Sequence, residues 1–88
     1  MTKSEVLKIL NETLEDIKKE RSVHHKMELC DIIAKYKKVV SEIEMDTLRY
    51  NEIANSVKAY LEIYNDYGNP LLYKISDAES AVKEYLLT

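Results

Sequence analysis

The 88-residue chain has one glycine, one proline and one cysteine, and no tryptophan or phenylalanine. So few turn-forming residues leave little material for hairpins or strand edges, which favours helices. The single cysteine, Cys30, excludes an internal disulfide and the disulfide framework of small secreted domains. No apolar run approaches the ~18 residues of a membrane span, and residues 1–11 lack the apolar core of a signal peptide. We therefore expect a cytoplasmic protein, or one exported in folded form without a cleavable signal.

The residues that are present are typical of one small helical domain, which we expect to cover residues 1–88. Hydrophobic residues make up 45% of the chain and charged residues 33%, a balance that argues against a disordered tail. The net charge of −3 comes from residues 45–88, which hold four basic and seven acidic residues. The lysine clusters of the first half are interleaved with acidic residues. They predict solvated helix faces and no nucleic-acid partner.

The first helix has a clear predicted start. Thr2 is a suitable N-cap, and Glu5, three residues later, completes a capping box. The apolar stripe that follows loses its phase at Arg21, so we expect this helix to end near Glu20 and Ser22 to cap the next one. The predicted buried face of the first helix consists of Leu7, Leu10, Leu14 and Ile17.

The only glycine and the only proline predict the last turn of the chain. Gly68 can take the left-handed conformation past the end of the third helix, Asn69 can cap the fourth, and Pro70 fits its first position. Apolar residues mark the third helix from Tyr50 to Tyr64 and the fourth from Leu71 to Leu86.

The segment from Glu42 to Ile53 leaves two architectures open. Heptad-like apolar spacing continues through it, as it would in one helix of about 45 residues. Yet the stripe becomes polar at Asp46, which could cap a new helix with Met45 and Tyr50 as a hydrophobic staple. We therefore favour a turn at Asp46 and an all-α, antiparallel up-down four-helix bundle. The alternative has three helices, with one long central helix over residues 22–66.

The residues with reactive or metal-binding side chains do not predict an enzyme. Glu20, His24 and Glu28 share a helical face, and His25-x-x-Glu28 resembles half of a carboxylate-bridged site in reverse order. Di-metal bundles, however, use a repeated Glu-x-x-His on facing helices, and no second copy exists here. Cys30 falls at helical spacing with Val23, Met27 and Ala34, so we expect it to be buried and inert. No glycine-rich loop is present to hold phosphate. We expect no enzyme activity, no cofactor and no metal.

Tyrosine is the unusual component, because all seven aromatic residues of the chain carry a hydroxyl group. The rings could fill one end of the bundle with their hydroxyls at the rim. Alternatively, they could form an acidic, tyrosine-rich contact surface for a partner with a basic patch. We expect Tyr64 to behave as core, and Tyr67 and Tyr73 as surface. The candidate partner-binding residues are Tyr60, Tyr64, Tyr67, Tyr73, Asp66 and Asp77.

These patterns predict a non-enzymatic helical-bundle protein that acts by binding another protein of unknown identity. In size and architecture alone, this class of chain is similar to bacteriocin immunity proteins and to small phage- or plasmid-encoded modulators. No residue motif carries the similarity. The alternative function is a structural or assembly subunit that associates with copies of itself. Both a monomer and a homodimer are compatible with the sequence.

Overall fold

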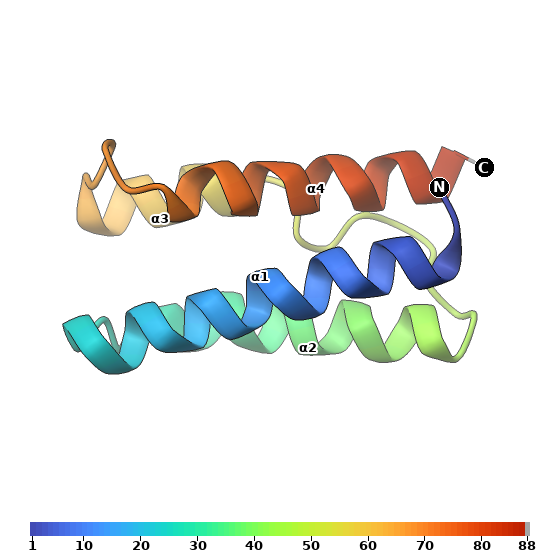
Figure 1. Ribbon diagram of the computed structural model, residues 1–88, viewed down its shortest axis with the longest axis horizontal. Coiled ribbons are helices and arrows are strands. Elements are labelled where there is room, and N and C mark those ends of the chain that lie inside the picture. Colours follow the sequence, from blue (N-terminus) through green and yellow to red (C-terminus); the bar gives the residue numbers. More distant parts are fainter. Residues whose placement is uncertain (88) are drawn as a thin grey trace.

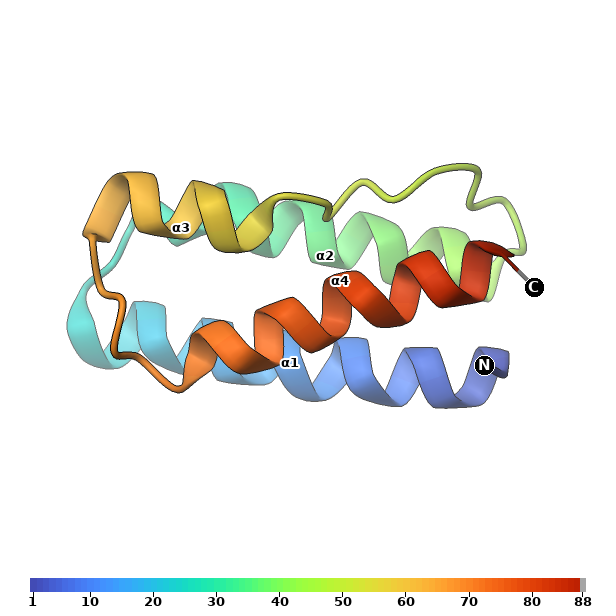
Figure 2. The ribbon, with the colours of Figure 1, turned by 90° about the horizontal axis from the view of Figure 1, so that it is seen from above.

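Four helices make up the fold of residues 1–87, the part of the chain that the computed structural model describes. They are α1 (Lys3–His24), α2 (Leu29–Glu44), α3 (Ser56–Tyr64) and α4 (Leu71–Leu87). The helices run up and down along one long axis, with α1 and α2 in one layer and α3 and α4 in the other (Figure 1). Helix α1 packs against both α2 and α4, and α3 packs mainly against α4 (Figure 2). The predicted all-α four-helix bundle is confirmed.

The core forms where the apolar stripes of the helices face one another. Leu10, Leu14 and Ile17 are buried as predicted, whereas Leu7 is only partly buried and Val6 takes the innermost position of the first turn. Ile53 is also fully buried, although it belongs to no helix. The buried apolar residues are Val6, Leu10, Leu14, Ile17, Leu29, Ile32, Ile33, Tyr36, Val39, Ile43, Ile53, Tyr60, Leu71, Ile75, Ala78, Ala81 and Val82.

Helix α1 begins as predicted but ends later. The Thr2 hydroxyl accepts a hydrogen bond from the backbone N–H of Glu5 at 3.1 Å, which confirms the cap. The prediction that the helix ends near Glu20 is wrong, because α1 continues to His24 and Ser22 lies inside it. The helix stops where His25 adopts the left-handed conformation, with φ 55°. The apolar phase is lost earlier because the last turn of α1 is largely exposed to solvent.

The turn after α2 excludes a single long central helix. Helix α2 ends at Glu44, and Asp46 has a left-handed φ of 60°. Asp46 is not the N-cap of the third helix, however, because residues 45–55 form an irregular connection and α3 begins only at Ser56. Met45 and Tyr50 are 68% and 64% exposed, so the predicted hydrophobic staple does not form.

Polar contacts hold this connection against the rest of the bundle. Asn51 Nδ2 donates to the backbone carbonyl of Glu79 on α4 at 3.0 Å. The backbone N–H of Ser56 donates to Glu79 Oε1 at 2.8 Å. Lys38 pairs with Glu52 at 2.8 Å, and Glu42 lies beside the same carboxylate. Interaction with Glu52, followed by burial, raises the pKa of Glu42.

The connection between α3 and α4 was predicted only in part. Asn69 Oδ1 accepts a hydrogen bond from the backbone N–H of Leu71 at 2.9 Å, so Asn69 caps α4 as predicted, and Pro70 stands immediately before the helix. The prediction for Gly68 is wrong, because the left-handed residue that ends α3 is Asn65, with φ 52°. Asparagine adopts this conformation more easily than most residues with side chains. Among residues 1–87, no helix has the length and apolar character needed to cross a bilayer.

Candidate functional site

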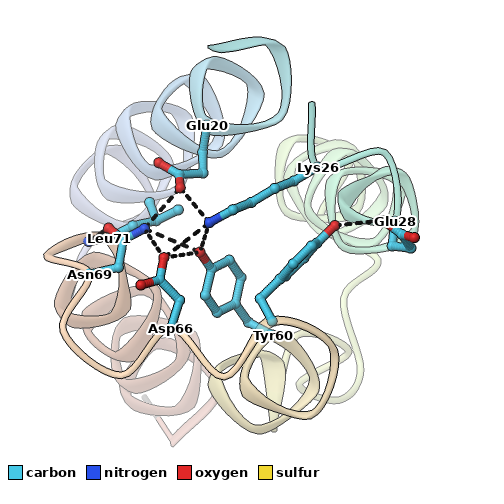
Figure 3. Close-up of polar contacts among 8 residues, drawn as sticks. Glu20, Lys26, Glu28, Tyr60, Asp66, Asn69 and Leu71 are labelled. Atoms are coloured by element: carbon cyan, nitrogen blue, oxygen red, sulfur yellow. Dashed lines mark hydrogen bonds and ion pairs between the residues drawn. The ribbon is translucent and has the colours of Figure 1, made fainter. Parts of the chain in front are cut away.

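A polar network around Lys26 joins the two connections at one end of the bundle, where α1 passes to α2 and α3 passes to α4 (Figure 3). The Lys26 side chain is only 15% exposed. Its Nζ atom donates hydrogen bonds to Glu20 Oε2 at 2.7 Å, to the Tyr60 hydroxyl at 2.5 Å and to Asp66 Oδ2 at 3.0 Å. The ammonium group therefore uses all three of its donors inside the protein.

Asn69 completes this network from the opposite side. Its Nδ2 atom lies 2.9 Å from Glu20 Oε2, 2.9 Å from Asp66 Oδ2 and 3.1 Å from the Tyr60 hydroxyl. The Tyr60 hydroxyl in turn donates to Asp66 Oδ2 at 3.1 Å. Since the participating residues come from α1, from α3 and from both connections, the network fixes the relative position of four chain segments. We call Glu20, Lys26, Tyr60, Asp66 and Asn69 the Lys26 network.

The electrostatics of the network keep its charges in place at neutral pH. Burial alone would lower the pKa of Lys26, but hydrogen bonds to Glu20, Tyr60 and Asp66 outweigh that effect and raise it. Hydrogen bonds from Asn69, Lys26 and Tyr60 lower the pKa of Asp66. Lys26 is therefore positively charged at neutral pH and lies between the carboxylates of Glu20 and Asp66.

Two tyrosine rings flank the Lys26 ammonium. Its Nζ atom lies 5.0 Å from the ring centroids of both Tyr60 and Tyr64, within the range of a cation–π contact. The ring centroids are 5.2 Å apart, and the ring planes are tilted by 48°. The Tyr64 hydroxyl donates to Glu28 Oε2 at 2.8 Å. Burial and this hydrogen bond raise the pKa of Tyr64 to about 12.

The structure separates the six sequence-predicted site residues into groups. Tyr60 is fully buried, so its ring belongs to the core and is not accessible to a partner. Tyr64 is half-buried, and Asp66 is occupied by the Lys26 network. Tyr67 and Tyr73 are 71% and 78% exposed, as expected, and Asp77 is exposed on α4. The six residues therefore do not form one continuous contact surface.

Exposed apolar side chains gather at the same end of the bundle as the Lys26 network. Five of the eight large hydrophobic residues that are exposed among residues 1–87 lie on the two connections or on the adjoining helical turns. Sequence reasoning did not find Val23 and Met27, because both fitted a helical stripe expected to be buried. The five residues are Val23, Met27, Ile63, Tyr67 and Tyr73.

The prediction that Cys30 is buried is also wrong, because the helical stripe to which it was assigned is exposed. Cys30 is exposed, as are the residues that were expected to pack around it. Its Sγ atom accepts a hydrogen bond from Arg21 Nη1 at 3.2 Å. The apolar stripe of α2 that does reach the core runs through Leu29, Ile33 and Tyr36 instead.

A hollow of about 280 Å³ opens beside the Lys26 network, between the last turns of α1 and the start of α4. Val23, Pro70 and Leu71 supply its apolar lining. Its remaining lining residues are Asp16, Lys19, Glu20, His24 and Lys74. Such a hollow is large enough to receive one side chain of a partner.

The arrangement of possible metal ligands can be stated for the described residues. Within residues 1–87, no three histidine, cysteine, aspartate or glutamate side chains gather in a way that could hold a metal ion. Comparison with protein families, with curated proteins and with solved structures found no match to this chain. Its function therefore has to be argued from the geometry of the site.

Proposed function

We propose that this protein is a non-enzymatic, cytoplasmic binding protein that contacts another protein through the end of the bundle beside the Lys26 network. The observation that carries the proposal is the concentration of exposed apolar side chains there. We call Val23, Met27, Ile63 and Tyr67 the end surface. Clustered exposed apolar residues on a soluble domain typically mark a contact site, and Tyr and Met are enriched in interfaces.

The Lys26 network supports this proposal by holding the two connections of the end surface together in the folded state. A partner that binds a surface which is already ordered does not have to offset the entropy of ordering it. The network joins the α1–α2 connection to the α3–α4 connection through hydrogen bonds of 2.5–3.1 Å. The hollow lined by Val23, Pro70 and Leu71 supplies a place for an anchor side chain of the partner.

Two test substitutions and two matched controls test the proposal. Proteins captured from the native host on the immobilised chain are purified, and the dissociation constant of each is measured by titration calorimetry. Met27→Ala and Tyr67→Ala should weaken binding by roughly 30-fold each if they are anchor residues. Met45→Ala and Tyr50→Ala are the controls, since these side chains are similarly exposed (68% and 64%) but lie on the other connection. Equal effects of all four substitutions would contradict the proposal.

The same variants distinguish binding of another protein from the alternative function, a self-associating assembly subunit. In that case the protein alone would sediment as a homodimer, and Met27→Ala and Tyr67→Ala would convert it to a monomer. The more specific role as an immunity-type protein or a phage- or plasmid-encoded modulator is a proposal supported only by similarity in size and architecture. It predicts that the captured partner is a toxin or a regulated host protein.

A further inference from the structure

A second hollow, a groove, lies farther along the seam between α1 and α4, and it shares Lys74 with the hollow beside the Lys26 network. The groove encloses about 420 Å³. Ile9 and Thr13 of α1 and Ala81 of α4 form its floor, and its surface is mainly apolar. Thr13 and Ala81 are buried at the bottom of the groove (3% and 2% exposed), and the partly buried Met1 and Ile9 supply its accessible apolar surface.

The rim of this groove carries three carboxylates that form no ion pair among residues 1–87. Glu12 lines it from α1, and Asp77 and Glu84 line it from α4; all three are exposed. Lys74, the one lysine that lines the groove, is paired with Asp16 and also interacts electrostatically with Glu12.

The spacing of the acidic residues indicates the shape of the ligand. Asp77 and Glu84 are seven residues apart on α4, which places them about 10 Å apart along the helix axis. Ala81 lies between them on the side that faces α1. A helix that carries two basic residues two turns apart, with apolar residues between them, would match both the charges and the apolar floor.

From this match we infer that the groove between α1 and α4 binds a basic amphipathic helix of a partner protein. The inference rests on the proposal that the chain acts by binding proteins, but it uses none of the residues of the end surface. It also assigns a role to Asp77, which belongs to no contact of the Lys26 network. Opposite charges on the groove and on the partner helix would speed their association and make the affinity depend on salt concentration.

The probe for this inference is a synthetic alanine-rich helical peptide with two lysines two turns apart and leucines between them. The control peptide has glutamate in place of both lysines. Nitrogen-15 NMR titration of the full chain should show shifts for Ile9, Thr13 and Ala81 with the lysine peptide and none with the control peptide. Absence of shifts at these residues would overturn the inference.

Two triple variants then distinguish groove binding from general attraction to an acidic protein. Glu12→Gln with Asp77→Asn and Glu84→Gln should weaken peptide binding by about tenfold, since exposed ion pairs each contribute modestly. The control variant removes the same charge at the exposed residues Asp31, Glu44 and Glu62 and should bind almost as the parent does. Equal weakening by both variants would overturn the inference. Neither outcome affects the test of the end surface, which is read at Met27 and Tyr67.

Discussion

Replacement of Lys26 by methionine tests whether the polar network stabilises the fold. Methionine keeps most of the apolar stem and removes only the charge and its three hydrogen bonds. Loss of one partner from a buried ion pair costs roughly 3–5 kcal/mol, because the other charge is left without compensation. The Asp66 side chain is 40% exposed, so water can partly replace its contact. We therefore expect a loss of about 2–3 kcal/mol of unfolding free energy.

Urea unfolding followed by circular dichroism measures this loss. With a slope of ~1 kcal/mol per molar, at the low end for small domains, the midpoint should fall by about 2–3 M. The pH dependence has a definite sign. Since the pKa of Asp66 is lowered in the folded state, its contribution is present above its ordinary pKa and is lost as pH falls through the lowered value. The difference between parent and Lys26→Met should therefore narrow below about pH 4.

Two comparisons make the result decisive. Lys37→Met removes an exposed lysine of α2 that forms no ion pair within residues 1–87, and it should change stability by less than about 0.5 kcal/mol. Glu20→Gln with Asp66→Asn, added to Lys26→Met, should recover part of the loss because no carboxylate is then left unpaired. If Lys26→Met costs no more than Lys37→Met, the network contributes nothing to stability.

Four further positions give shorter tests. His25→Gly should raise the unfolding free energy by about 1 kcal/mol in urea unfolding, because His25 holds a left-handed φ of 55° that glycine adopts without strain. Gly68→Ala should be neutral or should stabilise by up to about 1 kcal/mol, since its φ is not positive and an added Cβ meets nothing within 4 Å. A loss of stability would instead indicate that Gly68 holds a left-handed conformation. Cys30 should react with a water-soluble thiol reagent in the native protein almost as fast as in the unfolded one, and slow labelling would contradict its exposure. Glu42→Gln should raise the urea midpoint near pH 7, since it removes a negative charge beside Glu52 from a group whose pKa is raised in the folded state; the gain should disappear at about pH 4, where the native carboxyl is protonated.

The helices themselves could be predicted because their signals are local. The cap at Thr2, the cap at Asn69 and the apolar stripes all lie within a few residues of the structure that they determine. The connection after α2 could not be predicted in the same way. The apolar spacing continues through it because Ile53 reaches the core from an irregular segment, so the pattern alone imitates a helix.

The site was less predictable because its contacts join distant parts of the chain. Lys26 meets Asp66 across 40 positions, and Glu20 meets Asn69 across 49. No local pattern specifies such pairs, and Lys26 looked like one more lysine in a solvated cluster. Tyr67 and Tyr73 were correctly expected at the surface, but Val23 and Met27, at the same end of the bundle, fitted a helical stripe that proves to be exposed.

The shortness of α3 has a consequence for the motions of this protein. A helix of nine residues does not persist in water by itself, so α3 depends on its contacts with α4 and on the Lys26 network for its order. The irregular residues 45–55 on one side give it a long tether. Residues 45–70 are therefore the segment that we expect to open first in the native state, with the fastest amide hydrogen exchange among the elements. Because Ile63 and Tyr67 lie on this segment, a bound partner would hold it closed and slow that exchange.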